Sequence, residues 1–260
     1  MTTAKRLEDC LRTNILGRTI VRFVEVDSTS NAARALAKRG YGDGTVVLAE
    51  VQTAGRGREG RRWHSPRGGL WMSILLRSKP RDIAPSLLSL AAGVAVAKGI
   101  RRQLGVEASL TWPHDVRIHS RKVCGILAEA FKPEDEQFII LGIGINAEGS
   151  TAAYPEELRT DAITLEEAAG VKIDKDAITA SVLEELERFY PQIITNEETA
   201  SSMLEEWRRS SFMLGKAVTV EIGEEKLVGV AENVEEDGAL LVRLEDGSHH
   251  HIVSGSVTVN

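Results

Sequence analysis

The spacing of apolar and polar residues predicts a long segment of mixed strands and helices. Thr19–Val26 and Thr45–Val51 are rich in β-branched residues and predict strands, whereas apolar residues recur every four positions along 174–194 and predict a helix. We also expect helices over 1–17, 31–39, 83–104 and 197–210, a short one from Thr164, and strands over 70–77, 108–112, 116–119, 123–131 and 137–146. Because strands and helices do not alternate strictly, the pattern favours an α+β fold over a doubly wound sheet.

The pattern changes after Phe212. Residues 216–259 hold only short alternating stretches, and Asp237-Gly238 and Asp246-Gly247 are strong hairpin signals. We therefore expect two domains, a larger one over residues 1–212 and a small β-barrel over residues 213–260. The second contains three adjacent histidines at 249–251. Because neighbours on a strand alternate faces, these histidines favour a surface strand over a metal site.

The composition of the chain indicates the compartment in which the protein folds. The 260 residues are 42% hydrophobic, which is enough for a proper core, and only Cys10 and Cys124 are cysteines. Two distant cysteines do not make a disulfide scaffold and fit a reducing cytoplasm. The N-terminus lacks an apolar signal region, and no apolar run approaches the length of a membrane span. We expect a cytoplasmic protein with no membrane partner.

Residues 55–69 form the most unusual segment, with five arginines, five glycines and one acidic residue. This glycine density predicts a mobile loop, because glycine weakens helices and strands. Residues 52–77 carry a net charge of +5 while the whole chain carries −6, so the positive charge is concentrated here. Arginine binds carboxylates and phosphates bidentately. The loop therefore favours an anionic small-molecule ligand over a merely solvated segment.

Four further segments are ordinary when taken one at a time. Asp27-Ser-Thr-Ser-Asn31 resembles a helix cap, Thr111-Trp-Pro-His-Asp115 a turn with a packed tryptophan, and Lys122 a lysine at the start of an apolar strand. Gly142-Ile-Gly-Ile-Asn146 allows close approach to a buried strand. It does not fit a dinucleotide fingerprint, since the third glycine and a following helix are missing.

The order of these segments along the chain is more specific than any one of them. Asp-Ser-Thr, then Gln-Thr-Ala-Gly-Arg-Gly-Arg-x-Gly-Arg-x-Trp-x-Ser-Pro, Trp-Pro-x-Asp, Arg-Lys-x-x-Gly-Ile-Leu-x-Glu and Gly-Ile-Gly-Ile-Asn together resemble a biotin–protein ligase. The resemblance runs from about Val26 to Asn146, and residues 213–260 are similar to the C-terminal domain of that family. It implies a mixed-sheet catalytic domain of the biotin/lipoate ligase type followed by a small SH3-like β-barrel.

The resemblance also implies a reaction. Biotin and ATP with Mg²⁺ would form biotinyl-5′-AMP, and a lysine of a biotin carboxyl carrier protein or domain of a biotin-dependent carboxylase would then receive biotin. Lys122 matches the catalytic lysine, and Arg56 is assigned to the catalytic step with it. The biotin-binding positions match Ser28, Thr29, Gln52, Gly55, Arg56, Arg58, Lys122 and Gly125. The nucleotide-binding positions match Arg58, Arg61, Trp63, His114, Asp115 and Asn146. Metal ligands stay unassigned.

The chain departs from the family pattern at three positions. The usual Lys-Trp-Pro-Asn-Asp has Thr111 in place of lysine and His114 in place of asparagine, and Ala162 stands where a tryptophan often covers the adenine. We expect Thr111 and His114 to make the handling of ATP weaker or more pH-sensitive, and T111K with H114N to lower the KM for ATP. Ala162 is expected to leave the cover over the adenine less complete.

Other functions remain open at the level of the sequence. Only 26 residues precede Asp27, too few for a winged helix-turn-helix, so we expect a monofunctional ligase that does not bind DNA. A lipoate or octanoate ligase or transferase of the same fold is one alternative, and a non-catalytic biotin sensor is another. A nucleic-acid binder is disfavoured by the pI of about 5.6. A homodimer formed by sheet extension is compatible with the resemblance.

Overall fold

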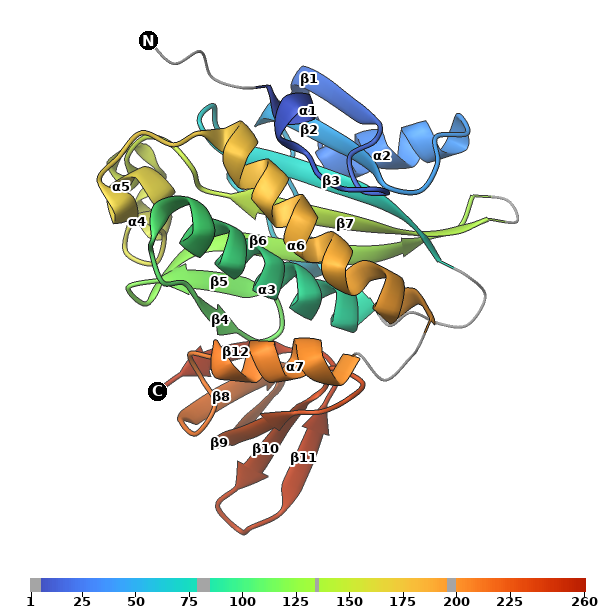
Figure 1. Cartoon of the computed structure of the whole chain (residues 1–260). Coiled ribbons are helices and arrows are strands. Elements are labelled where there is room, and N and C mark those ends of the chain that lie inside the picture. The colour runs from blue at the N-terminus through green and yellow to red at the C-terminus, as the bar shows by residue number, and fades with distance from the viewer. Residues whose placement is uncertain (1–5, 79–84, 134–135, 196–199) are drawn as a thin grey trace.

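A seven-stranded mixed sheet is the centre of the larger part of the molecule (Figure 1). The computed structural model describes residues 6–78, 85–133, 136–195 and 200–260. The strands are β1 (Ile20–Val26), β2 (Thr45–Gln52), β3 (Leu70–Ser78), β4 (Ser109–Thr111), β5 (Asp115–Ile118), β6 (Arg121–Phe131) and β7 (Gln137–Ile145). Their order is β1-β2-β3-β7-β6-β5-β4, with β1 and β2 parallel and the other neighbours antiparallel. This arrangement confirms the expected α+β class.

Helices cover both faces of this sheet. The helices are α1 (Leu7–Cys10), α2 (Thr29–Lys38), α3 (Pro85–Leu104), α4 (Glu156–Arg159), α5 (Leu165–Ala169), α6 (Lys175–Thr195) and α7 (Ala200–Arg209). Figure 1 shows α3 and α6 side by side on one face and α2 on the other. The main core lies under α3 and α6, because their apolar residues pack against one side of the strands. A smaller core lies between α2 and residues such as Phe138 and Ile140 of β7.

The C-terminal strands form a separate antiparallel sheet, as expected. It contains β8 (Ala217–Ile222), β9 (Glu225–Val234), β10 (Leu240–Leu244), β11 (His249–Ile252) and β12 (Ser256–Val259), in the order β11-β10-β9-β8-β12. Figure 1 shows α7 between this sheet and the larger part of the molecule. Among the described helices, none combines the length and apolar character that crossing a membrane requires.

Local signals predicted most elements to within a few residues. The short helix expected from Thr164 is present as α5, and Thr164 caps it in a capping box with Glu167. The helix expected over 1–17 is wrong, since only Leu7–Cys10 is helical among the described residues of that range. Glu187 of α6 accepts hydrogen bonds from the backbone N–H groups of Ile15 at 2.8 Å and Leu16 at 2.7 Å. This carboxylate satisfies donors that a helix would have used, so the segment stays irregular. Residues 83–84 and 197–199 of two expected helices lie outside the described residues.

Candidate active site

A cavity of about 280 Å³ lies on the face of the large sheet that also carries α2. Gly142 and Gly144 of β7 point to the same side as Phe138 and Ile140, because residues two apart on a strand share a face. Near the N-terminal end of α2, these glycines have no side chains to fill the space over the sheet, and the cavity lies there. The loop after β2, the β4–β5 turn and the start of β12 close the cavity around them.

Two paired glycines form the floor under Trp63. Gly125 of β6 and Gly144 of β7 are register partners. A Cβ on Gly125 would come within 2.8 Å of the Trp63 ring, and one on Gly144 within 2.5 Å of its Nε1. Neither glycine has a positive φ, so close approach of the ring explains them better than backbone strain. Trp63 Nε1 is buried and donates to no group among the described residues, an arrangement that costs free energy.

Hydroxyl and amide groups gather at one end of the cavity. The Gln52 Oε1 atom accepts from the Thr29 backbone N–H at 2.8 Å and from Thr29 Oγ1 at 3.1 Å, and Gln52 Nε2 donates to Ser65. Ser28 caps α2, and its side chain is buried. Ser73 of β3 contacts Thr29 Oγ1 at 2.8 Å. These uncharged groups suit a neutral polar ring that both donates and accepts hydrogen bonds.

Lys122 and Asp115 form an ion pair in the cavity. The Lys122 Nζ atom lies 2.7 Å from Asp115 Oδ1 and 5.3 Å from the centre of the Trp63 ring. Both side chains are about one-fifth exposed, at 23% and 18%. The start of β6 is fixed because Ile163 donates its backbone N–H to the Lys122 carbonyl at 3.0 Å. A partly buried ammonium that is already held in place can neutralise an anionic ligand with little further loss of side-chain entropy.

His114 joins the β4–β5 turn to the arginine loop. Its Nδ1 lies 3.2 Å from Arg58 Nη1, and its Nε2 lies 3.5 Å from Asp115. Burial lowers the pKa of His114 from 6.5 to about 4; Asp115 opposes this shift, while Lys122, Arg58 and Arg61 add to it. A neutral imidazole can accept the Arg58 hydrogen bond at Nδ1. With a pKa this low, His114 is neutral at pH 7 in the ligand-free protein.

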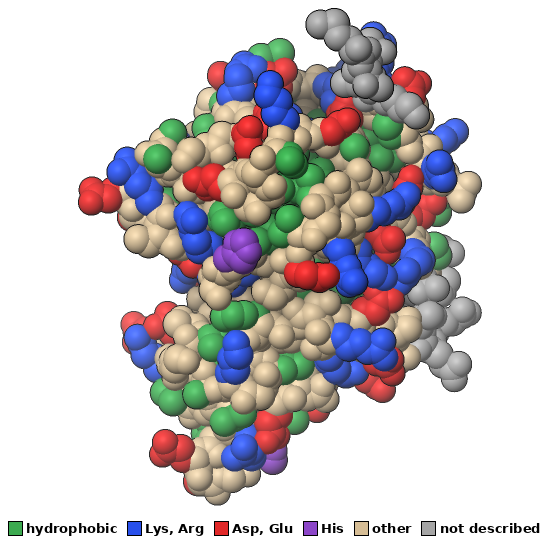
Figure 2. All heavy atoms as spheres, turned by 60° about the vertical axis from the view of Figure 1, so that its left-hand side comes forward, with side chains coloured by type: hydrophobic (Ala, Val, Ile, Leu, Met, Phe, Trp, Pro, Cys, Tyr) green, Lys and Arg blue, Asp and Glu red, His purple; other side chains and the backbone are tan. Residues whose placement is uncertain are grey.

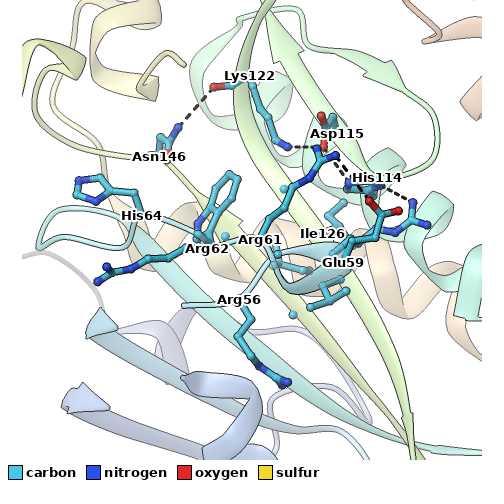
Figure 3. A pocket seen from close by; sticks show the side chains of 18 of the residues that line it. Arg56, Glu59, Arg61, Arg62, His64, His114, Asp115, Lys122, Ile126 and Asn146 are labelled. Atoms are coloured by element: carbon cyan, nitrogen blue, oxygen red, sulfur yellow. Dashed lines mark hydrogen bonds and ion pairs between the residues drawn. The ribbon is translucent and has the colours of Figure 1, made fainter. Parts of the chain in front are cut away.

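The remaining loop arginines point in different directions. Figure 3 shows Arg56 turned away from Lys122, and its Nη2 lies 2.9 Å from Glu129 Oε2. Arg34 of α2 contacts the same oxygen at 3.0 Å. Arg61 is 66% exposed and pairs with Glu59 of the same loop at 3.6 Å. The guanidinium groups of Arg56 and Arg61 are therefore held by carboxylates and could exchange them for an anionic ligand.

The side chain of Asn146 forms hydrogen bonds with backbone carbonyl groups. Its side-chain Nδ2 lies 3.3 Å from the Ile163 carbonyl and 3.4 Å from the Lys122 carbonyl, and Asn146 is 3% exposed. The amide thus holds the segment around Ile163 against the start of β6. Ala162 lies in this segment and lines the cavity.

The structure brings nearly all the expected site residues together. Ser28, Thr29, Gln52, Arg56, Arg58, Arg61, Trp63, His114, Asp115, Lys122, Gly125 and Asn146 all line the cavity. Gly55 does not line it but is buried beneath the loop, where a Cβ would meet Ser65 Oγ at 2.5 Å. Thr111 is buried in β4 and does not line the cavity either. T111K would bury an ammonium there, so we now expect it to cost stability instead of improving ATP binding.

Sequence reasoning missed several cavity residues. Gly255, Ser256 and Val257 of the C-terminal part line the cavity, and the Gly255 carbonyl lies 3.3 Å from Arg58 Nη1. No local signal marks them, because the packing of the two sheets brings them there. Ser73 does not line the cavity but contacts Thr29, which does. It was detectable as the one polar residue in the apolar run Leu70–Leu76.

Comparison with known proteins identifies the family. Residues 22–146 match the model of the biotin/lipoate A/B protein ligase family, and residues 213–259 match that of the biotin protein ligase C-terminal domain. A biotin–[acetyl-CoA-carboxylase] ligase of Mycobacterium tuberculosis is 34% identical, with 91% of this chain and 88% of that protein covered. The chain belongs to the biotin protein ligase family. The bifunctional ligase/repressor BirA of Bacillus spizizenii is 35% identical, with 91% of this chain and 73% of that protein covered.

A solved biotin protein ligase has the same fold. The enzyme from Aquifex aeolicus, in complex with biotin and ATP, has a TM-score of 0.82 and 29% identity, with 94% of this chain and all of that chain covered. Figure 2 shows basic and acidic side chains interspersed over the face in view.

Proposed function

We propose that this biotin protein ligase activates biotin with ATP and transfers it to a lysine of a biotin carboxyl carrier domain of a carboxylase. One observation carries the proposal: a single cavity combines an uncharged polar end at Thr29 and Gln52, a glycine floor, and a cationic end at Lys122. Biotin has three parts in the same order: a neutral ureido ring, an apolar body and a carboxylate. Curated relatives named as biotin–[acetyl-CoA-carboxylase] ligases support the reaction and its acceptor.

In the first step, a biotin carboxylate oxygen attacks the α-phosphorus of ATP. The new P–O bond forms as the bond from the α-phosphorus to the bridging oxygen breaks, and pyrophosphate leaves. Two anionic groups must approach, and we assign Lys122 to offset their repulsion, with Asp115 positioning its Nζ. Arg58, held at His114 and at the Gly255 carbonyl, is placed to meet a phosphate oxygen.

Mg²⁺ would enter with ATP. Mg²⁺ typically binds one or two carboxylates together with substrate phosphates and water, and its chemistry is to neutralise phosphate charge. Within the described residues, no trio of metal-ligating side chains lies in the cavity. Asp115 is the carboxylate that lines the cavity beside Lys122 and fits this role.

In the second step, the neutral amine of the acceptor lysine attacks the acyl carbon of biotinyl-5′-AMP. The bond from that carbon to the phosphate oxygen breaks, AMP leaves, and the amine loses a proton as the amide forms. We propose that Trp63 and Arg56 help hold the adenylate until the acceptor arrives, because a closed loop excludes the water that would hydrolyse it.

We further propose that residues 1–212 form the catalytic domain and residues 213–260 an accessory β-barrel. The two separate sheets and the family match over 213–259 support this division. A cytoplasmic location is proposed as well, since both cysteines are free, as in a reducing compartment. A homodimer stays a prediction, and sedimentation of the purified chain would test it.

Biotin-dependent exchange of pyrophosphate with ATP tests the first step, with lipoate and octanoate as alternative acids. We expect exchange with biotin alone, lost in K122A and retained in K132A, which changes an exposed lysine at the end of β6. Exchange with lipoate instead would assign the chain to the sister ligases. Tight biotin binding without exchange would make it a sensor and refute catalysis.

A further inference from the structure

Two histidines on β11 contact carboxylates in different ways. His249 and His251 lie two residues apart, so they share a face of the strand. His249 Nε2 lies 2.9 Å from Glu232 Oε2, and the same carboxylate also pairs with Arg243 at 2.5 Å. The charge of Glu232 is therefore balanced by an arginine.

His251 meets two carboxylates. Its Nε2 lies 3.0 Å from Asp237 Oδ2 and 3.2 Å from Glu235 Oε2. In the part of the chain that the structure describes, neither carboxylate has an ion pair with lysine or arginine. With a neutral imidazole this cluster has a formal charge of −2, whereas the cluster at Glu232 is balanced.

The cluster has the spacing of a metal site. The three ligand atoms, one from each residue, all lie within 4.8 Å of one another. Around a tetrahedral ion with bonds of about 2.0–2.1 Å, ligand atoms are roughly 3.3–3.4 Å apart. The contacts at His251 are already close to that separation, so side-chain rotation alone can bring the three atoms onto one ion.

The backbone holds these ligands at the junction of the two sheets. Glu235 and Asp237 lie in the β9–β10 turn, where Asp237 Oδ1 accepts the Ala239 N–H at 3.0 Å and leaves Oδ2 facing His251. The Trp112 Nε1 atom donates to the Gly238 carbonyl at 2.9 Å. The turn is thus fixed to the segment that leads into the cavity, although none of the three ligands lines the cavity itself.

We propose that Glu235, Asp237 and His251 bind one divalent transition-metal ion of the Zn²⁺ class, with water completing its shell. An imidazole with two carboxylates suits Zn²⁺, whereas Mg²⁺ prefers oxygen ligands alone. The ion would join β11 to the β9–β10 turn and stabilise the contact of that turn with Trp112. This site is separate from the proposed reaction and from the Mg²⁺ that accompanies ATP.

Calorimetric titration of the full chain with Zn²⁺ tests the site, with Mg²⁺ as the comparison ion. H251A is expected to weaken binding of one Zn²⁺ equivalent at least about tenfold, which is the lower range for loss of even an outer-shell partner. H249A and H250A are the matched controls on the same strand and should leave that equivalent in place. E235Q with D237N, which keeps side-chain size, should weaken it like H251A.

Thermal unfolding gives a second readout that does not depend on activity. Zn²⁺ should raise the Tm of the wild-type chain and of H250A but not that of H251A, because an ion that binds only the folded state stabilises it. The proposal is overturned if the wild-type chain shows no saturable Zn²⁺ binding. Equal weakening in H249A and H251A would overturn it too.

Discussion

Replacing His114 by asparagine is expected to remove a pH-dependent part of the stability of the protein. The side chain of His114 is 21% exposed, and burial lowers its pKa from 6.5 to about 4. In the unfolded chain, the imidazole takes up a proton near its ordinary pKa, whereas in the folded chain it stays neutral to a much lower pH. As the pH falls through this interval the unfolded state binds more protons, so the folded state loses stability.

The size of the effect follows from the two pKa values. The whole interval of about 2.5 units corresponds to roughly 3 kcal/mol, of which about 2 kcal/mol is lost between pH 7.5 and pH 5. An asparagine at this position cannot titrate. The stability of H114N should therefore fall less than that of the wild-type chain over the same range, by about 2 kcal/mol.

Urea unfolding, followed by circular dichroism at a series of pH values, measures this difference. Carboxylates such as Glu167, and also His64, titrate in both chains, so subtracting one curve from the other isolates His114. H119N is the matched control, because His119 is exposed and its φ of 49° lies in the left-handed region that asparagine tolerates. Equal losses of stability in H114N and the wild-type chain would refute the burial argument.

Two further substitutions test the loop and the floor. E129Q should release Arg56 and lower the KM for biotin by no more than about fivefold, since so exposed a pair is worth up to about 1 kcal/mol; an unchanged KM would show that Glu129 does not restrain the loop. G144A should displace Trp63 and lower kcat/KM for biotin by up to about a hundredfold. G42A, where an added Cβ meets nothing within 4 Å, is the control for G144A, and similar activity of both variants would contradict the role of the floor.

The sequence predicts best where the signal is local. Strands β6 and β7 and the helix that begins after Thr164 depend on residues within a few positions of one another, and all three were predicted correctly. The expected N-terminal helix failed because its backbone donors are satisfied by Glu187, which is more than 170 residues away for Leu16. Such a contact depends on the packing of α6, and the spacing of apolar residues in the N-terminal segment cannot predict it.

The site residues also fall into those that local motifs predict and those that only tertiary packing brings to the cavity. The resemblance depends on short motifs, and the cavity residues within those motifs were found from the sequence, including Lys122 and Asp115. Gly255 could not be found in this way, because it reaches the cavity only after the small sheet has packed against the large one. Thr111 also lies within one of these motifs, but it is buried in β4 and does not line the cavity.

The C-terminal part contributes to the cavity as well as to the fold, because Gly255, Ser256 and Val257 line it. Arg58 has two partners, the His114 imidazole from the large sheet and the Gly255 carbonyl from the small one. A loop this rich in glycine loses much conformational freedom when it orders, and two contacts from independent elements offset part of that loss. A carbonyl and a neutral imidazole hold a guanidinium more weakly than a phosphate does. We propose that Arg58 exchanges these contacts for the nucleotide when ATP binds, an exchange that a carboxylate at position 114 would oppose.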